Sequence, residues 1–534
     1  MAFIPIYLIF IPIIASMLVY LLHNKYVNYI IFAAQFFVTL LALKYYSIYN
    51  GLTKAQILSL GNWEKNIGIV LKNDQLSIAF IFLSIFIWWI ILIYCWNKRK
   101  NDFKFLFFLM FLEGCFLGLL QTNDLFNLFV FIEIITIIST ILILYKKDGY
   151  SVRAGLYYLL FNSTGMLFYL LGLILIYNVS GTLNIDITAQ KISVIKDTNF
   201  IKLGYIFIMA AIGVKSAFFP VFNWLPKAHG AAPSSISALL SGLLVKSGLY
   251  AFIRLNDMFK IKGFEDFFFF LGFLTAICGI IFALSQKDIK QILAFHTISQ
   301  IGMILIGISS SDSKIYIGGL MHIFNHAIFK SLLFLGAGAI INSYGIRRIT
   351  EIRGVFKRLP FISICMIIGM LSITGAPLFN GFVSKTIIKY GIGKSSTKIL
   401  MLFIINLGTS ISFIKLSQIF WGTSARENHK NINVYSSMLL LTIMCIVLGI
   451  YYKPIIMILF GVNISYIHVF KIKNFISYIF TLSAGYIIYR KAIRKDHEII
   501  QYIRHINISF GATNFLLITF VFIMILWEEI GKFL

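Results

Sequence analysis

Charged side chains lie deep inside long apolar stretches of this sequence, where a charge has few ordinary roles. In a helix, Glu133 of DLFNLFVFIEIITIISTILILY would lie roughly 14 to 18 Å from either end of its stretch. Lys215 in IFIMAAIGVKSAFFP and Lys246 in ISALLSGLLVKSGLYAFIRL lie comparably deep. Charges at this depth in a membrane typically serve a proton or ion pathway. For any single residue, a salt bridge that only joins two helices is an equal alternative.

Two more lysines repeat this arrangement later in the chain. Lys385 lies in ITGAPLFNGFVSKTIIKYG, 170 residues after Lys215, and Lys415 lies in INLGTSISFIKLSQIFWG, 169 residues after Lys246. The shared offset predicts an internal repeat of five membrane-spanning helices. Because five is an odd number, the two copies would have opposite orientations, and inverted repeats place ion sites near the membrane centre at broken helices.

Helix breakers interrupt the stretches that hold the first lysine of each pair. They are Pro220 and Pro226 in the first stretch, and Gly375, Pro377 and Gly381 in the second. A broken helix leaves backbone carbonyls that only protein or water can satisfy inside a membrane. Water at that depth is what proton transfer needs, although such breaks also occur in inert helices.

A polar stripe lies within another apolar stretch, in MHIFNHAIFK. His322, His326 and Lys330 are spaced at i, i+4 and i+8 and therefore share one helical face. The two histidines have the spacing of a zinc-protease helix, but Ile323 stands where the catalytic glutamate is needed, so this chemistry is rejected. The stripe predicts a proton relay. His296 in ILAFHTISQIG either extends this relay or only packs.

The composition excludes a water-soluble fold. Of 534 residues, 59% are hydrophobic and 12% are charged, with mean hydropathy +0.88, so the chain must lie in a lipid bilayer. The five cysteines are scattered singly, which predicts no metal site and no cofactor. The net charge of +26 is spread over loops rather than gathered in a soluble basic domain, so it reflects topology and not nucleic-acid binding.

The apolar stretches predict an all-α polytopic membrane protein of fourteen core helices. The predicted spans lie near residues 3–22, 27–46, 76–96, 104–121, 125–145, 153–177, 202–220, 234–255, 265–285, 290–309, 315–342, 361–392, 399–421 and 436–461. Two further apolar segments follow near 471–489 and 512–528. The first span is too long for a signal peptide and is expected to be a retained helix.

Arginine is concentrated in the loops that follow odd-numbered spans. These arginines are Arg99, Arg153, Arg347, Arg348, Arg353, Arg358 and Arg426, whereas Arg254 stands alone at the end of an even-numbered span. The positive-inside rule places the odd-numbered loops in the cytoplasm and the N-terminus outside. The charged segment 490–505 is expected to lie along the membrane surface.

Several long motifs carry a resemblance to a known family. They are GVKSAFFPVFNWLPKAHGAAPSSISALLSGLLVKSGLYAFIRL, SQKDIKQILAFHTISQIGMILIG, HIFNHAIFKSLLFLGAG and GAPLFNGFVSK, in that order. The chain from about residue 70 to 420 resembles the antiporter-like proton-channel subunits of respiratory complex I, Mrp cation/proton antiporters and membrane-bound hydrogenases. The resemblance implies fourteen helices with two inverted five-helix repeats and broken helices 7 and 12. The expected divisions are the N-terminal helices at 1–103, the first inverted repeat at 104–255, the second inverted repeat at 256–421 and C-terminal helices with an amphipathic connector at 422–534.

The same resemblance implies roles for individual residues. Glu133 and Lys215 match the family's switchable ion pair, and Lys246 matches the lysine that passes the proton onward. His326 matches a histidine of the central hydrophilic axis, and Lys385 matches the exit residue of helix 12. A lysine held beside a carboxylate keeps its proton, and it releases that proton when the carboxylate moves away.

Two positions depart from the pattern of many complex I members. Gln300 stands where those members have a histidine, which puts the relay between His326 and Lys246 in question. Lys385 replaces a glutamate, as in Mrp D-type and hydrogenase-type subunits. Lys415 remains a possible further member of the pathway.

The favoured function is a proton-translocating, antiporter-like membrane subunit of a larger complex, either of Mrp Na+/H+ antiporter type or of NADH-quinone oxidoreductase or hydrogenase type. The expected partners are other membrane subunits, the bilayer of a bacterial plasma membrane, and H+, with Na+ left open. A stand-alone secondary cation or solute/proton antiporter is the alternative, and a scaffold without transport is a third possibility. No redox centre is predicted within the chain. Whether the chain is part of an enzyme is left open, because its parent complex would be an oxidoreductase in one of these readings.

Overall fold

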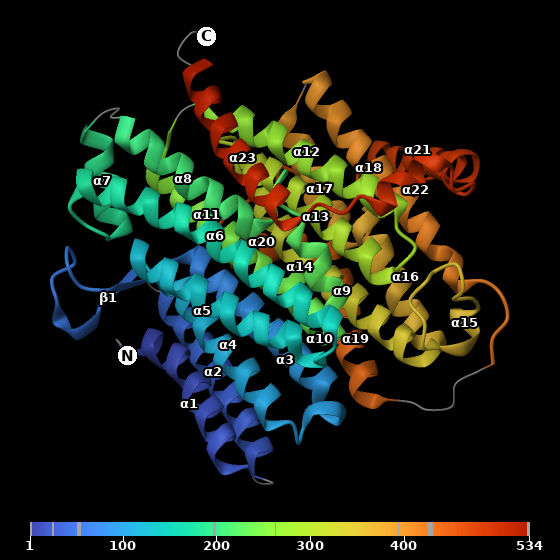
Figure 1. Cartoon of the computed structure of the whole chain (residues 1–534), viewed down its shortest axis with the longest axis horizontal. Coiled ribbons are helices and arrows are strands. Elements are labelled where there is room, and N and C mark those ends of the chain that lie inside the picture. Colours follow the sequence, from blue (N-terminus) through green and yellow to red (C-terminus); the bar gives the residue numbers. More distant parts are fainter. Residues whose placement is uncertain are drawn as a thin grey trace.

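The computed structural model describes residues 3–23, 26–50, 55–195, 199–261, 263–393, 395–425 and 431–530, and Arg426 lies outside this part. Helices that are far apart in sequence run side by side through most of it (Figure 1). Fourteen helices of the described chain are long and apolar enough to cross a membrane. The all-α polytopic fold is therefore confirmed.

The elements follow one another as a nearly continuous series of helices. The N-terminal part contains α1 (Ile4–Leu22), α2 (Val27–Asn50), β1 (Gln56–Ser59), β2 (Val70–Asn73), α3 (Gln75–Arg99), α4 (Phe103–Gln121), α5 (Leu125–Ile143), α6 (Gly149–Ser180) and α7 (Ile185–Ile195). The middle part contains α8 (Asn199–Ser216), α9 (Trp224–Ala231), α10 (Ser234–Leu239), a π-helical turn (Leu240–Leu244), α11 (Val245–Phe259), α12 (Phe264–Ser285), α13 (Ile289–Ile308) and α14 (Ser313–Tyr344). The C-terminal part contains α15 (Val355–Arg358), α16 (Pro360–Thr374), α17 (Asn380–Ile392), α18 (Ser396–Ser417), α19 (Ile432–Ile450), α20 (Tyr452–Phe460), α21 (Ile472–Ile488), α22 (Glu498–His505) and α23 (Phe510–Ile530).

Two predicted spans are each divided into two helices. The predicted span 361–392 becomes α16 and α17, because Gly375 adopts a left-handed conformation with φ of 81° and ends α16. The predicted span 436–461 becomes α19 and α20, which meet at Tyr451. The fourteen spanning helices therefore include α23 and not the broken twelfth span.

The predicted surface segment near 490–505 contains α22, none of whose residues is buried. Arg504 of α22 pairs with Asp496, and Asp496 also pairs with Lys287 at 2.7 Å. These contacts hold the segment against the loop that follows α12.

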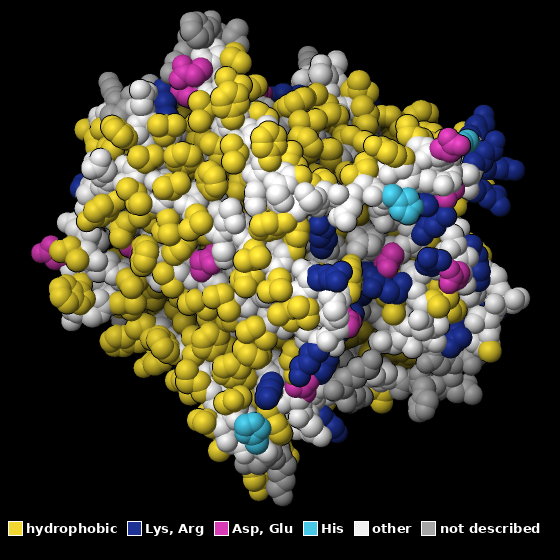
Figure 2. Space-filling view, viewed as in Figure 1, with side chains coloured by type: hydrophobic (Ala, Val, Ile, Leu, Met, Phe, Trp, Pro, Cys, Tyr) yellow, Lys and Arg dark blue, Asp and Glu magenta, His cyan; other side chains and the backbone are white. Residues whose placement is uncertain are grey.

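Apolar side chains cover much of the outer surface. Figure 2 shows them over the face formed by α5, α6 and α23, with Lys and Arg gathered toward one end of the molecule. Inside, glycines let helices approach closely: a Cβ added to Gly302 of α13 would lie 2.3 Å from the carbonyl oxygen of Gly272 in α12. Close backbone contact of this kind is how helices pack in lipid, where burial of apolar surface gives no driving force.

The connecting loops alternate between the two ends of the bundle, as the predicted topology requires. At one end, the loops after even-numbered spans meet. Leu71 of β2, in the loop after the second span, pairs with Thr122 in the loop after the fourth. Asp124 of that loop pairs with Asn184 in the loop after the sixth. At the other end, Asp288 pairs with Arg347 at 2.7 Å, and both follow odd-numbered spans. The helices therefore cross the bundle in alternating directions.

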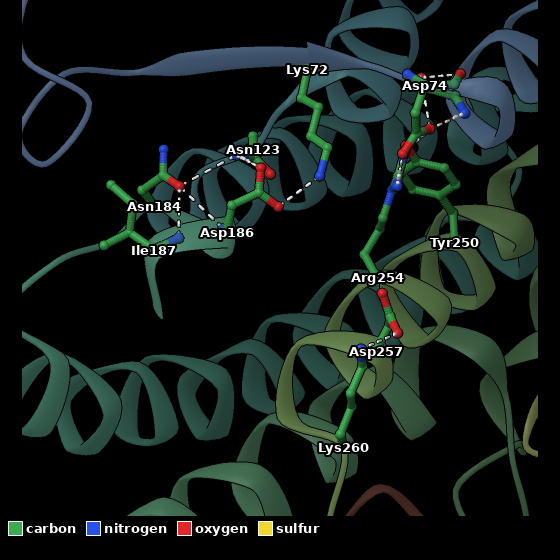
Figure 3. Close-up of polar contacts among 11 residues, drawn as sticks. Lys72, Asp74, Asn123, Asn184, Asp186, Ile187, Tyr250, Arg254, Asp257 and Lys260 are labelled. Carbon is green, nitrogen blue, oxygen red and sulfur yellow. Dashed lines mark hydrogen bonds and ion pairs between the residues drawn. The ribbon is translucent and has the colours of Figure 1, made fainter. Parts of the chain in front are cut away.

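A polar cluster ties together the first of these ends (Figure 3). Lys72 of β2 lies 2.6 Å from Asp186 at the start of α7, and Arg254 of α11 donates two hydrogen bonds to the Asp74 carboxylate that caps α3. Burial opposes ionisation of Asp74, but the hydrogen bonds and charge of Arg254 outweigh it and hold the pKa of Asp74 at about 2. The cluster thereby fixes the C-terminal half of α11.

Asp74→Asn is expected to lower the free energy of unfolding by about 1.5–3 kcal/mol, because it leaves the Arg254 guanidinium without its charged partner. Since folding depresses the pKa of Asp74, its stabilisation is complete above the ordinary carboxyl value of 3.8 and disappears as the pH falls toward about 2. Thermal unfolding of the purified protein in detergent, followed across this pH range, measures both effects.

Asp257→Asn is the matched control for this prediction. Asp257 pairs with Lys260 at 3.5 Å, but the two side chains are 79% and 74% exposed, so the pair is screened by solvent and its loss should not change the unfolding midpoint. Equal midpoints for the two variants would contradict a structural role for the Asp74–Arg254 pair.

Candidate functional site

Lys215 lies in the last turn of α8, next to the break in predicted helix 7. Its Nζ donates a hydrogen bond to Thr136 Oγ1 at 2.6 Å and lies 3.5 Å from the Tyr158 hydroxyl. Glu133 instead accepts a hydrogen bond from Ser163 at 2.9 Å, and no ion pair joins these two described residues. Thr136 is one turn after Glu133 on α5, so the Lys215 ammonium group contacts the helix that carries Glu133. In this structure the two side chains therefore have different hydrogen-bond partners.

The break itself is built from local hydrogen bonds. After α8 ends, Ala217 adopts a positive φ of 57°. The Val214 carbonyl accepts from the Ala217 amide at 3.1 Å and also from Trp224 Nε1, at the start of α9, at 2.8 Å. Thr275 Oγ1 of α12 accepts from the Phe219 amide at 3.0 Å. These contacts satisfy backbone groups that the interrupted helix would leave open.

Gly248 of α11 brings the end of α8 close to the second lysine-bearing helix. A Cβ at this position would lie 2.4 Å from Ser216 Oγ and 3.2 Å from the carbonyl carbon of Lys215. Gly248 is two residues after Lys246. This close approach places the two lysine-bearing segments side by side in the protein interior.

Lys246 follows a π-helical turn that the sequence analysis did not predict. The turn spans Leu240–Leu244, and it leaves the Ser241 carbonyl as an acceptor for Lys246 Nζ. The same Nζ lies 2.6 Å from His326 Nδ1 of α14. As an ammonium group, Lys246 donates to Nδ1, which leaves the ring hydrogen on His326 Nε2.

The direct contact between Lys246 and His326 corrects the doubt raised by Gln300. Gln300 lies elsewhere: its Oε1 is 3.2 Å from His322 Nε2, and His322 Nδ1 is 2.8 Å from Ser384 Oγ. The glutamine therefore contacts the next histidine of the stripe and does not interrupt the link between His326 and Lys246.

Lys385 follows Ser384 on α17, beyond the break in helix 12. Its Nζ donates to the Ile373 carbonyl at 2.7 Å, one of the groups left open where α16 ends. Gly381, predicted as part of the break, is instead the second residue of α17, where a Cβ would lie 1.9 Å from the Ser372 carbonyl oxygen of α16. Lys215 precedes its break and Lys385 follows its break, so the equal sequence offset does not give the two lysines equivalent positions.

The remaining predicted residues make separate contacts. Lys330 is fully buried and donates to the Leu293 carbonyl of α13 at 2.7 Å. His296 is fully buried against Phe413, and neither ring nitrogen has a hydrogen-bond partner among the described residues. Lys415 donates to the Leu284 and Gln286 carbonyls at 2.5 and 2.6 Å, which caps the end of α12 and accounts for its burial.

Three buried ionisable residues were missed by the sequence analysis. Glu113 is fully buried in the middle of α4 and accepts from Gln35 Nε2 of α2 at 2.9 Å. The depth rule applied to Glu133 would have found it. His229 stacks on Phe334, and Lys290 donates to the Ala232 carbonyl at 2.8 Å. Both belong to short or terminal segments, where depth cannot be judged from sequence.

The row from Glu133 to Lys385 includes polar atoms that no described protein group satisfies. They are Glu133 Oε1, Ser139 Oγ, Ser216 Oγ, His326 Nε2, Asn325 Oδ1 and Ser372 Oγ. Buried polar atoms in folded proteins nearly always have a partner, and ordered water is the partner that remains. These atoms are positions at which bound water would complete the hydrogen bonding of the site.

Comparisons with known proteins agree with this arrangement. Residues 122–414 match the family described as NADH:quinone oxidoreductase/Mrp antiporter, TM. The chain is 30% identical to the D-type subunit of the Na(+)/H(+) antiporter of Alkalihalophilus pseudofirmus, over 76% of this chain and 84% of the relative. It is also 30% identical to the D-type subunit of the Na(+)/H(+) antiporter of Bacillus subtilis, over 70% of this chain and 78% of that protein.

Two solved structures share the fold. A chain of the archaeal membrane-bound sulfane sulfur reductase superposes with a TM-score of 0.80 at 26% identity, covering 90% of this chain and 99% of that one. A chain of the Mrp complex from Dietzia sp. superposes with a TM-score of 0.79 at 20% identity, covering 94% and 99%. By sequence and by fold, the chain belongs to the NADH:quinone oxidoreductase/Mrp antiporter family of membrane subunits.

Proposed function

We propose that this chain is a proton-translocating subunit of a multi-subunit membrane complex, similar to the Mrp D-type subunits. The observation that carries the proposal is a row of ionisable groups. It begins at the partly buried Glu133 and continues through the buried residues Lys215, Lys246, His326, His322 and Lys385. Such groups are costly to bury in a membrane protein, and together they provide successive proton carriers.

The separated Glu133 and Lys215 suggest how the row is switched. When Lys215 moves one turn from Thr136 to Glu133, the ion pair favours the protonated lysine. When the pair opens, the ammonium group is destabilised and passes its proton through water toward Lys246. Lys246 then transfers a proton to His326 Nδ1, while His326 loses the proton on Nε2 toward His322. Because His322 is about 6 Å along the same helix, a bridging water completes this step.

The transport unit would consist of two inverted repeats, 104–255 and 256–421, preceded by 1–103 and followed by 422–534. The chain would lie in a plasma membrane with its N-terminus outside, as the arginine-rich loops indicate. The relatives named as Na(+)/H(+) antiporter subunits favour Na+ as the ion exchanged for H+ by the whole complex. Electron transfer, where the parent complex performs it, would take place in other subunits.

Reconstitution into liposomes tests this function. The complex that contains this chain is expected either to form a pH gradient or to dissipate an imposed one, as recorded with a pH-sensitive dye. The chain without its partners is expected to do neither. Gradients with and without Na+ distinguish Na+/H+ exchange from proton transport alone. Full exchange by the isolated chain would support the stand-alone antiporter, and no proton movement in any complex that contains the chain would refute the proposal.

A further inference from the structure

Helix α21 carries its polar side chains on the face that is turned toward the protein. Asn474, Ser477, Tyr478 and Thr481 recur at i, i+3, i+4 and i+7 and are all partly or fully buried. The opposite face carries exposed apolar residues, namely Ile472, Ile476, Ile479, Phe480 and Ile487, with exposed fractions between 53% and 78%. In a lipid environment, an apolar outer face contacts lipid, so the polar inner face must cover something polar.

The polar face of α21 covers a cavity of about 70 Å³ beside the break in helix 12. Lys385 and Lys389 of α17, Asn406 of α18 and the four polar residues of α21 line it. Asn406 Oδ1 is buried and has no described partner. The Tyr478 hydroxyl lies 3.2 Å from Thr374 Oγ1, the residue directly before Gly375. The cavity therefore joins α21 to the break that holds Lys385.

The lining chemistry suits water rather than a metal cation. No carboxylate lines the cavity within the described chain, whereas two ammonium groups and several hydroxyl and amide groups do. Its volume corresponds to about two water molecules at roughly 30 Å³ each. Lys385 is 7% exposed and Lys389, one turn later, is exposed, so the lining leads from the buried ammonium group to the surface.

We propose that α21 is the outer wall of an aqueous vestibule through which Lys385 exchanges its proton with the medium, and that Tyr478 is the positioning residue that holds this wall against the broken helix. The vestibule is built by an element outside the 122–414 segment that matches the family. The role given to Lys385 rests on the proposed function, whereas the presence of water beside α21 does not.

Cysteine labelling tests whether the inner face of α21 is wet. Ser477→Cys and Ile476→Cys lie at nearly the same depth, but Ser477 is partly buried whereas Ile476 is exposed. A charged, membrane-impermeant methanethiosulfonate reacts with thiolates only in water. In membrane vesicles that contain the full complex, Ser477→Cys is expected to react at least about 10-fold faster, after subtraction of the parent chain's rate. Equal rates, or faster reaction of Ile476→Cys, would overturn the proposal whether or not the complex transports protons.

Transport by Tyr478→Phe tests the positioning role. Loss of the hydroxyl is expected to slow proton transport about 3- to 10-fold and to shift its pH profile, because the contact between α21 and Thr374 is lost beside Lys385. Tyr486→Phe, on the exposed face of the same helix, should leave the transport rate and its pH profile unchanged. An unchanged rate and pH profile in Tyr478→Phe would overturn this role. Fast labelling of Ser477→Cys in a complex that moves no protons would support the vestibule and refute only the proposed function.

Discussion

Lys215→Ala is expected to abolish proton transport, with a loss of at least about 100-fold, while the complex still assembles. The structure places the Lys215 ammonium group on Thr136, one turn from Glu133, at the start of the row. Alanine removes the group that carries the proton, and the described residues around this break provide no other cation in the same position. Proton uptake by liposomes that contain the variant complex measures the effect.

Lys215→Arg separates proton transfer from charge balance. Arginine keeps a positive charge and hydrogen-bond donors but does not release its proton at accessible pH, so this variant is also expected to be inactive. Lys227→Ala is the matched control, because Lys227 lies on α9 over the Tyr157 ring and donates to the Ile508 carbonyl, outside the row. Wild-type transport by Lys215→Arg would show that the lysine acts only as a fixed charge.

Lys246→Met is the second variant expected to lose transport, again by about 100-fold or more. Methionine has a similar unbranched shape but cannot donate to His326 Nδ1, so the link between α11 and α14 is removed. The same assay of pH-gradient formation measures the loss, and the elution profile of the purified complex verifies assembly.

Lys415→Met provides the comparison for Lys246→Met. Lys415 follows Lys246 by 169 residues, much as Lys385 follows Lys215 by 170. Lys415 nevertheless caps the carbonyl end of α12 and lies outside the row. Its replacement should lower the unfolding free energy by about 1.5–3 kcal/mol, the worth of hydrogen bonds to a charged group, while transport persists. Loss of transport in Lys415→Met without loss of stability would restore it to the pathway.

Glu133→Gln completes the set. Glutamine has a similar shape and keeps an oxygen that can accept the hydrogen bond from Ser163, but it lacks the negative charge that attracts Lys215. A transport defect in Glu133→Gln as deep as in Lys215→Ala is the result that a switchable pair requires, whereas wild-type transport by this variant would leave Lys215 without its charged counterpart.

Much of the fold was predictable because its signals are local in sequence. Apolar length decides which segments cross the bilayer, and the predicted short span near 290–309 appears as α13 at Ile289–Ile308. Proline and glycine marked both broken helices, since each acts on the backbone of its own turn. The same counting predicted interior positions for Lys215, Lys246 and the histidine stripe, and these side chains are buried. Glu133, predicted in the same way, is only partly buried.

Tertiary packing alone decided which of these residues meet. Lys215 contacts Thr136 across 79 positions, and Lys246 contacts His326 across 80, so neither pairing has a local signal. The π-helical turn, the capping role of Lys415 and the inward polar face of α21 also depend on the neighbouring helix. Sequence by itself determined where along each helix a charged residue lies, because that position is counted along one helix. Only the tertiary structure decided their partners, because a partner is set by the approach of helices that are distant in the chain.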